Sequence, residues 1–480
     1  MLHSPHDLVR SPLIGGELII TDQRHPVVNP STGEIVDEIL LGGVAEIDAA
    51  VVSAAAASKG WAALTAPERG RILRNIGAAI SARAEELAEI ESIDTGKPTK
   101  QSLSDVALAA RYFEYYGSIV EALEGSVVDL GEQGFATVTN EPLGVTGHIV
   151  PWNYPIQIMC RSIAPSLAAG NTIVVKPAED ACLSTLLTAK IALDAGLPAG
   201  VFNIVPGLGA VAGQALADHP GIEHIAFTGS VPVGRHVAAA AAARGRASTL
   251  ELGGKGAHLV LESANLTKAL PVVLSTLLQN GGQTCSAGTR LVIHKSLHDE
   301  AMTMLRDLMS AVVTGPGLTD PDLGPLISQR QLDRVEGFVE RAVASGAVIH
   351  AESAPPTGNG GFFSPARVIG GVSPDSELAQ EEIFGPVLTV LPFDDVDEGL
   401  AIVNGSRYGL TTGVWGADFQ SANYAARRVD AGQVYVNGFV AGGGVQLPFG
   451  GYKDSGYGRE KGAPALKAYT QSRTTVTSLS

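Results

Sequence analysis

The sequence predicts an α/β protein built on a doubly wound parallel sheet. Short runs rich in valine and isoleucine at 145–150, 172–176, 201–205 and 224–228 read as strands. The last three are each followed by an alanine- or leucine-rich segment that reads as a helix. A strand and helix alternation of this kind favours parallel strands with helices on both faces, and ligands then bind beyond the carboxyl ends of the strands.

Length and composition exclude several classes of protein. At about 100–200 residues per domain, 480 residues correspond to two to four domains. Hydrophobic residues make up 45% and charged residues 17%, which suits a packed core and not a disordered chain. The net charge of 33 − 49 = −16 disfavours binding to phosphate backbones, so no nucleic-acid partner is expected.

Three cysteines, Cys160, Cys182 and Cys285, are too few for a disulfide framework or a four-cysteine zinc site. They suit a reducing compartment, and the N-terminus has no apolar core of a signal peptide, so a cytoplasmic location is predicted. No apolar run approaches about 18 residues, so no membrane association is expected. Neither HExxH nor GxxxxGK[ST] occurs, and no metal site is predicted.

The N-terminal part reads as an extended segment at 25–36, with a turn at 29–33, followed by helices. Apolar residues at three and four spacing place these helices at 47–60, 67–94 and 103–123. The second has a capping Thr65 and an early Pro67 at its start.

The turns that follow the central strands predict nucleotide binding. Gly207 and Gly209 follow a strand, but the next glycine is Gly213, one residue later than in the dinucleotide pattern. Gly229-Ser230 is a second strand-to-helix turn whose N–H groups can face a pyrophosphate. On the residues alone, plain turns remain an equal alternative.

Lys176 and Glu179 lie just after a strand and suit the hydroxyl groups of a ribose, the alternative being a surface charge pair. A carboxylate at the ribose repels a 2′-phosphate, which favours NAD over NADP.

A second α/β region is predicted from residue 253 to 453, with strands at 258–261, 290–293, 387–391 and 433–436. The segments 127–140 and 474–478 also have β character but no evident partner in their own domain. Edge strands of this kind often pair between subunits.

Three side chains are candidates for catalysis. Cys285 lies among glycine, glutamine, threonine and serine, and a helix beginning there would lower the pKa of its thiol. Cys160 and Cys182 have apolar, helical surroundings and are interpreted as structural.

Glu251 ends an apolar strand, where an unpaired carboxylate is costly to bury; a salt bridge with Lys255 is the alternative. Asn153 is held between Pro151 and Pro155 and can donate to an oxyanion, although turn asparagines are common.

These residues lie in motifs that resemble the NAD(P)-dependent aldehyde dehydrogenase superfamily along nearly the full chain. The matching segments are 29–34, 94–98, 151–155, 176–179, 227–230, 250–255, 282–285, 381–387, 448–453 and 455–456, together with the 34-residue step from Glu251 to Cys285.

The resemblance implies oxidation of an aldehyde to the acid through a thiohemiacetal and a thioester on Cys285. Glu251 would be the general base and Asn153 an oxyanion donor, and the presence of Glu251 favours hydrolysis over transfer to coenzyme A. Lys176 and Glu179 would hold the adenosine ribose, and Glu382 and Phe384 the nicotinamide riboside. The full cofactor-binding set would be Val150, Trp152, Lys176, Glu179, Gly209, Phe227, Gly229, Ser230, Leu252, Glu382 and Phe384.

The resemblance also implies three domains. Residues 1–116 and 143–252 would form a modified Rossmann cofactor domain, and 253–453 the α/β catalytic domain. Residues 117–142 and 454–480 would form a small β extension that assembles a homodimer or homotetramer.

The substrate is open between a semialdehyde that bears a carboxylate and an aromatic or otherwise bulky aldehyde. Arg161 is similar to the carboxylate-binding arginine of succinate-semialdehyde members, but Gln279 stands where those members carry a second arginine. The glycine-rich loop 440–445 would line the substrate tunnel. The candidate walls are Tyr154, Phe113, Tyr116 and Phe439.

Two other classes remain as alternatives. A cysteine hydrolase without redox chemistry, such as a thioesterase or esterase, would need a histidine paired with Cys285, and no motif indicates one. A non-catalytic protein on the same fold would be expected to have lost Cys285, Glu251 or Asn153, and all three are present.

Overall fold

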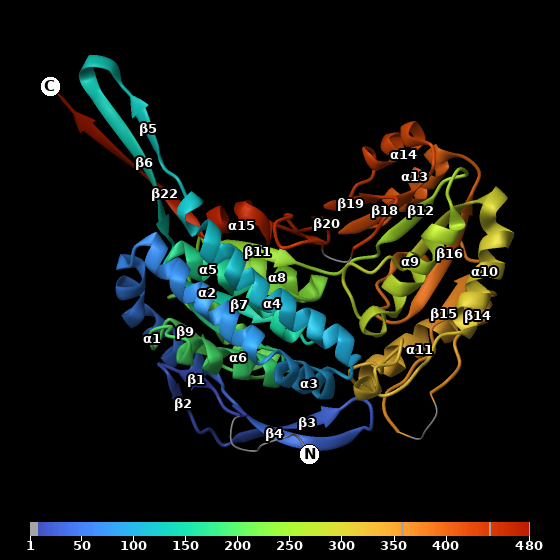
Figure 1. The fold of residues 1–480 in the computed structure, drawn as a ribbon, viewed down its shortest axis with the longest axis horizontal. Coiled ribbons are helices and arrows are strands. Elements are labelled where there is room, and N and C mark those ends of the chain that lie inside the picture. Colours follow the sequence, from blue (N-terminus) through green and yellow to red (C-terminus); the bar gives the residue numbers. More distant parts are fainter. Residues whose placement is uncertain (1–7, 357–359, 441–442, 480) are drawn as a thin grey trace.

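The computed structural model of the chain describes residues 8–356, 360–440 and 443–479. Two α/β lobes lie side by side, and a narrow β arm projects from the first (Figure 1). The last strand, β22 (Thr470–Ser478), runs along this arm. The predicted α/β class, with two sheets and a small β extension, is confirmed.

The first lobe is built on an eight-stranded sheet. Its order is β2 (Glu17–Leu18), β1 (Leu13–Ile14), β9 (Phe202–Ile204), β8 (Thr172–Pro177), β7 (Val145–Val150), β10 (His224–Thr228), β11 (Ala247–Glu251) and β21 (Gly456–Tyr457). The five strands from β9 to β11 run parallel, as predicted for a doubly wound sheet. Their carboxyl ends therefore meet at one edge.

Helices cover both faces of this sheet (Figure 1). They are α1 (Val44–Ala63), α2 (Ala66–Ala82), α3 (Ala84–Thr95), α4 (Thr99–Ile119), α5 (Pro155–Ala169), α6 (Leu183–Asp194), α7 (Gln214–Asp218) and α8 (Val231–Ala243). The single helix predicted over 67–94 is two helices, because Arg83 leaves helical geometry at φ −115° and ψ 26° and ends α2. The predicted N-terminal turn joins β3 (Gln23–Asn29) and β4 (Glu34–Leu41) into an antiparallel hairpin.

The second lobe contains a seven-stranded sheet. Its order is β14 (Val348–Glu352), β15 (Arg367–Gly370), β16 (Val387–Phe393), β13 (Arg290–His294), β12 (Ala257–Val260), β18 (Thr411–Trp415) and β19 (Gln433–Val436). The predicted strands are β12, β13, β16 and β19, whereas β14, β15 and β18 were not predicted. Its helices are α9 (Leu266–Leu278), α10 (His298–Ser310), α11 (Gln329–Ala344), α12 (Glu377–Gln380), α13 (Val396–Asn404) and α14 (Phe419–Ala426). A two-stranded ladder of β17 (Tyr408–Gly409) and β20 (Tyr452–Lys453) lies beside it.

The arm is a three-stranded antiparallel sheet of β5 (Ser126–Asp129), β6 (Gly134–Pro142) and β22 (Thr470–Ser478). The two segments without an evident partner in the sequence therefore pair with each other in one chain. The residues just before β22 lie against the first lobe instead. There β21 pairs with β11, and α15 (Gly462–Ala468) packs on α5.

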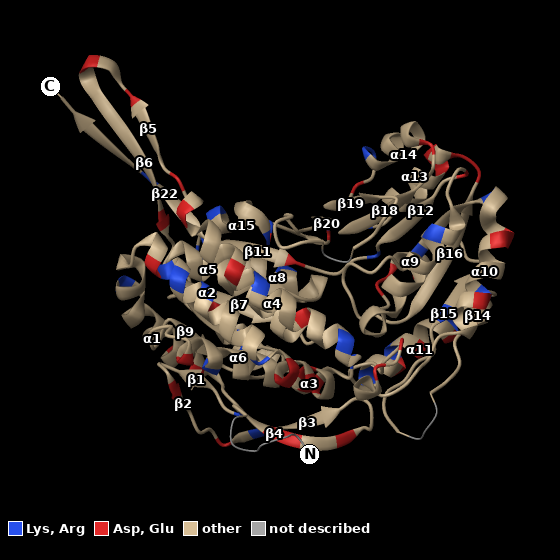
Figure 2. Cartoon of the chain, in the orientation of Figure 1, with Lys and Arg blue, Asp and Glu red and all other residues tan. Residues whose placement is uncertain are grey.

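Among the described residues, no helix combines the length and the apolar character that crossing a bilayer would require. Acidic positions gather on α3 (Figure 2), and two of them, Glu91 and Asp94, are buried.

Helices α2 and α4 pack closely because glycines face each other. A Cβ atom on Gly70 would lie 2.5 Å from the carbonyl oxygen of Gly117, and one on Gly117 would lie 2.8 Å from that of Gly70. Neither carbonyl can move without disturbing its helix. The contact between these helices therefore depends on the absence of side chains.

We expect Gly70→Ala to lower the free energy of unfolding by about 1–3 kcal/mol, because the added methyl group overpacks a backbone contact. Gly60→Ala, in the exposed part of α1, is the matched control, since a Cβ atom there meets nothing within 4 Å. The control should gain about 0.5–1 kcal/mol from helix propensity alone. Urea unfolding followed by tryptophan fluorescence measures both, and equal gains would contradict the close packing.

Candidate active site

The segment that carries Cys285 is shaped by a left-handed turn. After α9, Asn280 has φ 51°, Gly281 φ 63° and Gly282 φ 73°. A Cβ atom on Gly282 would lie 2.4 Å from the backbone of Gly385. Only glycine fits there, so the cysteine segment passes directly against the segment that carries Glu382 and Phe384.

The expectation that a helix begins at Cys285 is wrong. The chain turns after the cysteine and enters β13 at Arg290, so no helix N-terminus stabilises the thiolate. Burial raises the pKa of Cys285 to about 12, and the charge of Arg161 opposes that rise. Cys160 and Cys182 lie in the apolar core, where burial raises the pKa of each thiol well above its ordinary value.

Glu251 reaches the same region from the first lobe, at the end of β11. A Cβ atom on Gly254 would lie 2.3 Å from the carbonyl oxygen of Cys285, so the strand end and the cysteine touch through their backbones. Neither carboxylate oxygen of Glu251 has a hydrogen-bond partner among the described residues. The alternative salt bridge with Lys255 is not formed, because the buried Nζ of Lys255 has no partner in that part of the chain either.

The pKa of Glu251 lies well above its ordinary value. Burial is the main cause and the nearby charge of Glu460 adds to it, while Arg161 opposes both. A carboxyl group with such a pKa can take up a proton readily, as a general base must.

Asn153 follows β7 and is held from both sides. Its Nδ2 donates to the carbonyl of Gln283 at 2.9 Å, two residues before the cysteine. Its own carbonyl accepts from Lys97 Nζ at 2.9 Å and from Asn280 Nδ2 at 2.7 Å. One of the two amide N–H bonds is thus used for positioning, and the other remains for a ligand.

Lys97 comes from the segment 94–98, one of the motifs that carried the resemblance but to which no role was assigned. Its side chain is fully buried, with Nζ 2.7 Å from Asp105 and 3.4 Å from Glu91. The same Nζ lies 4.3 Å from the ring centroid of Tyr154. A buried cation with two carboxylates is fixed in place. This cluster therefore locks the Asn153-Tyr154 turn.

The predicted cofactor residues gather at the carboxyl edge of the first sheet. Val150 ends β7, with Trp152 beyond it, and Phe227 lies in β10. Gly229 and Ser230 form the turn into α8.

Lys176 and Glu179 form an ion pair of 2.8 Å, and the second carboxylate oxygen of Glu179 accepts from the N–H of Gly209 at 3.3 Å. The two groups therefore form a charge pair, but Lys176 is buried, so it is not the surface pair named as the alternative.

Glu382 lies where the two lobes meet. Its Oε1 accepts from the N–H of Gly254 at 2.9 Å, beside Leu252, and a Cβ atom on Gly253 would lie 2.3 Å from Oε2. Burial raises the pKa of Glu382 to about 7. Phe384 packs edge to face on Trp152 with ring centroids 5.4 Å apart. The carboxylates of Glu179 and Glu382, with the glycine-rich turns of this edge, suit the two riboses and the pyrophosphate of a dinucleotide.

A narrow cavity of about 30 Å³ opens at Cys285. It is lined by Tyr112, Tyr154, Gln157, Ile158, Arg161, Gln279, Thr284, Cys285, Ser286, Gly443, Phe449 and Lys461. Tyr154 and Arg161, both predicted to contact the substrate, line this cavity.

The other predicted walls lie elsewhere. Phe439 is packed in the second lobe against His258 and Tyr435. Phe113 and Tyr116 are fully buried in the core of the first lobe, and Tyr112 of the same helix faces the cavity. Of the glycine-rich loop, residues 441 and 442 lie outside the described residues.

Sequence reasoning missed Glu460 and Lys461. Arg161 Nε lies 2.5 Å from Glu460 Oε2, an ion pair whose angle is outside that of a hydrogen bond. Lys461 lines the cavity next to it. In the sequence these two residues are only an acidic and a basic residue side by side after Gly458-Arg459. Their place at the site follows from the long-range contact of Glu460 with Arg161 of α5.

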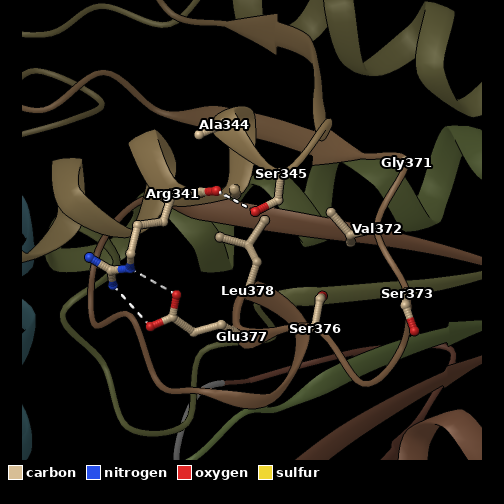
Figure 3. Close-up of a pocket in the computed structure, with 10 residues that line it drawn as sticks. Arg341, Ala344, Ser345, Gly371, Val372, Ser373, Ser376, Glu377 and Leu378 are labelled. Carbon is tan, nitrogen blue, oxygen red and sulfur yellow. Dashed lines mark hydrogen bonds and ion pairs between the residues drawn. The ribbon is translucent and has the colours of Figure 1, made fainter.

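A larger cavity of about 550 Å³ lies in the second lobe (Figure 3). Its charged groups, Arg341 and Glu377, are exposed and already paired at 2.9 and 3.0 Å. Cys285 lines the smaller cavity, and Glu251 lies near enough to raise the pKa of Cys285, so volume is a poor guide to chemistry here.

Residues 20–475 match the model of the aldehyde dehydrogenase family. The chain belongs to the aldehyde dehydrogenase family. It is 38% identical over 447 residues to DhaS of Bacillus subtilis (strain 168), covering 92% of this chain and 90% of that protein. The chain is thus an enzyme that acts on aldehydes.

Solved structures of the family agree. A crystal structure from Burkholderia cenocepacia superposes with a TM-score of 0.95 at 45% identity, over 97% of this chain and 99% of the other. The NAD+ complex of the aldehyde dehydrogenase from Bacillus cereus superposes with a TM-score of 0.95 at 34% sequence identity, and the match covers 98% of this chain and 96% of the other. PnpE in complex with nicotinamide adenine dinucleotide superposes with a TM-score of 0.95 at 36% sequence identity, and the match covers 98% of this chain and 97% of the other.

The raised pKa of Cys285 predicts how its thiol reacts with iodoacetamide. Below the pKa the thiolate fraction rises about tenfold per pH unit, so the labelling rate should climb in that proportion from about pH 7 to 9. Stopped-time labelling and peptide mass spectrometry measure the rate, with Cys285→Ala as the control for the two core cysteines. A plateau below about pH 8 would contradict the raised pKa.

Proposed function

We propose that the enzyme oxidises an aldehyde to the carboxylic acid through a thioester on Cys285, which water hydrolyses with Glu251 as general base. The observation that carries this proposal is that two other segments converge on the Cys285 segment. The backbone just after Glu251 touches the carbonyl of Cys285 at Gly254, and the Asn153 amide donates to the carbonyl of Gln283, two residues before the cysteine.

The cofactor is NAD, as in the family's solved complexes. Lys176 and Glu179 would hold the adenosine ribose and Glu382 the nicotinamide ribose, and the carboxylate of Glu179 disfavours a 2′-phosphate. When bound, NAD accepts a hydride from the substrate carbon.

The first step is attack of sulfur on the carbonyl carbon. The thiol proton passes to the Glu251 carboxylate, the C–S bond forms, and the carbonyl oxygen becomes an oxyanion. The remaining N–H of Asn153 and the N–H of Cys285 would bind that oxygen, at about 3–4 kcal/mol for one donor. Breaking of the C–H bond restores the carbonyl and leaves a thioester.

Hydrolysis completes the cycle. Glu251, having released its proton to solvent, takes a proton from water as the water attacks the thioester, an effect of about 10²- to 10⁴-fold on the rate. The C–S bond breaks and the thiolate returns. One aldehyde, one water and one NAD+ give one carboxylate, one NADH and two protons.

A cysteine hydrolase has less support. The residues described at the Cys285 cavity include no histidine, whereas a Cys-His pair would require one there. Formation of NADH that depends on an aldehyde separates the two functions.

We also propose that residues 1–116 and 143–252 form the cofactor domain, 253–453 the catalytic domain, and 117–142 with 454–480 the extension that assembles a homodimer or homotetramer. The arm supports this, because Val127 and Val476 on its two outer strands are 72% and 65% exposed. Exposed apolar edge strands are suited to pairing with another copy. Three cysteines without a disulfide support a cytoplasmic location.

Replacing Glu251 by glutamine should separate the two half-reactions. We expect the steady-state rate to fall by about 10²- to 10⁴-fold, because hydrolysis loses its base. A burst of up to one NADH per subunit should remain if the Cys285 proton can leave by another route. Stopped-flow absorbance of NADH measures both phases, with Cys285→Ala as the control without a burst. A fall of less than tenfold would exclude Glu251 as the base.

Removal of residues 470–480 should weaken assembly. The truncation deletes β22 and leaves the β5–β6 hairpin, which is marginal on its own. We expect a smaller particle in analytical ultracentrifugation and faster proteolysis within 126–142, with the thermal midpoint of the lobes little changed. An unchanged mass would contradict the assembly role of the arm.

A further inference from the structure

We propose that Tyr154 is a positioning residue: its hydroxyl holds Thr284, and through Thr284 it directs the N–H of Cys285 at the oxygen of the tetrahedral intermediate. This inference rests on the proposed function of Cys285, in which that N–H is one of two oxyanion donors.

The hydrogen bond between the two hydroxyl groups has a defined direction. Tyr154 Oη and Thr284 Oγ1 lie 2.6 Å apart, and both residues are buried. Thr284 Oγ1 donates its hydrogen to the carbonyl of Gln279, at 3.4 Å. The Tyr154 hydroxyl is therefore the donor to Thr284. Burial raises the pKa of Tyr154 well above its ordinary value, so the hydroxyl keeps this proton.

This bond acts on the peptide group that carries an oxyanion donor. The N–H of Cys285 belongs to the planar peptide group that begins at Thr284, so its direction follows the position of Thr284. The residue before Thr284 is held in a similar way, because the carbonyl of Gln283 accepts from Asn153 Nδ2 at 2.9 Å. Residues 153 and 154 thus fix the two residues that precede the nucleophile.

Tyr154 is itself held in place. Its carbonyl accepts from the N–H of Ile158 at 2.9 Å, in the first turn of α5. Lys97 Nζ lies 4.3 Å from the centroid of the Tyr154 ring, and the same Nζ donates to the carbonyl of Asn153. A buried cation with two carboxylate partners has little freedom to move. The hydroxyl is therefore presented to Thr284 from a rigid base.

The spacing of the two donors matters because an oxyanion donor acts only at hydrogen-bond distance from the charged oxygen. Tyr154 is connected to both donors, since it follows Asn153 in the chain and holds the residue before Cys285. The sequence assigned Tyr154 to the wall of the substrate tunnel. A wall needs only the ring, whereas the bond to Thr284 needs the hydroxyl, so phenylalanine at 154 separates the two roles.

The test compares two kinds of reaction at the Cys285 sulfur in the full-length enzyme. Attack on a carbonyl develops an oxyanion, and it is followed as NADH formation from propanal or as hydrolysis of 4-nitrophenyl acetate. Alkylation by iodoacetamide develops none. For Tyr154→Phe we expect kcat with propanal to fall about 10- to 100-fold with little change in KM, because the oxygen gains its charge only after attack. Ester hydrolysis should fall by a similar factor, and the rate of Cys285 alkylation should stay within about threefold of wild type.

Further variants test the bond itself. Thr284→Val should reproduce the loss, and the double variant with Tyr154→Phe should lose no more than either single variant, because both changes remove one bond. Thr284→Ser keeps the acceptor oxygen and should retain most of the rate. Tyr116→Phe is the matched control and should leave both reactions unchanged, since it removes another buried tyrosine hydroxyl, which donates to the carbonyl of Gly462 at 3.0 Å.

Equal slowing of the carbonyl reactions and of alkylation would overturn the inference, because it would indicate a displaced sulfur and not a misdirected N–H. An unchanged kcat in Tyr154→Phe would also overturn it, as would losses that multiply in the double variant. If the wild type forms no NADH from any aldehyde, the proposed function fails, and hydrolysis of the ester still tests the positioning role.

Discussion

The active site depends on three backbone segments that touch where no side chain intervenes. The end of β11 meets the carbonyl of Cys285 through Gly254, and the cysteine segment meets Gly385 through Gly282. Each of these contacts would be closed to any residue with a Cβ atom. They bring the strand end that carries Glu251 against the segment that carries Cys285, while Glu382 accepts a hydrogen bond from the N–H of Gly254. The chemistry depends on these close main-chain contacts, which side-chain hydrogen bonds such as that of Asn153 to Gln283 reinforce.

Burial then decides the electrostatics of these groups. Lys97 has two carboxylates and the carbonyl of Asn153 as partners, so its charge is compensated and its position is fixed. Glu251 has no such partner, and its raised pKa and that of Cys285 reflect the same loss of water. Positioning groups are thus paired and reacting groups are left unpaired. An unpaired buried carboxylate lowers the stability of the fold. Because no cation holds its charge, such a carboxylate can exchange a proton with water.

The sequence was informative wherever the signal is local. Alternating strands and helices predicted β7, β8, β9 and β10 and the edge at which Lys176 and Glu179 lie. The absence of a helix at Cys285 was not predictable in this way. The chain that follows the cysteine enters β13, and β13 is held in place by pairing with β12 and β16, which are distant in the sequence. Lys97 and Lys461 were beyond local reasoning for the same cause. Lys97 reaches Asn153 across 56 positions, and Arg161 meets Glu460 across about 300, so neither spacing carries a periodic signal.

The pairing of Arg161 with Glu460 also explains why Arg161 is an ambiguous position for testing substrate charge. Arg161 lowers the pKa of Glu251 and of Cys285, while Glu460 raises that of Glu251. Removing Arg161 would leave Glu460 buried without its closest cation and would shift both reacting groups at once. Loss of activity would then follow for every aldehyde, charged or neutral.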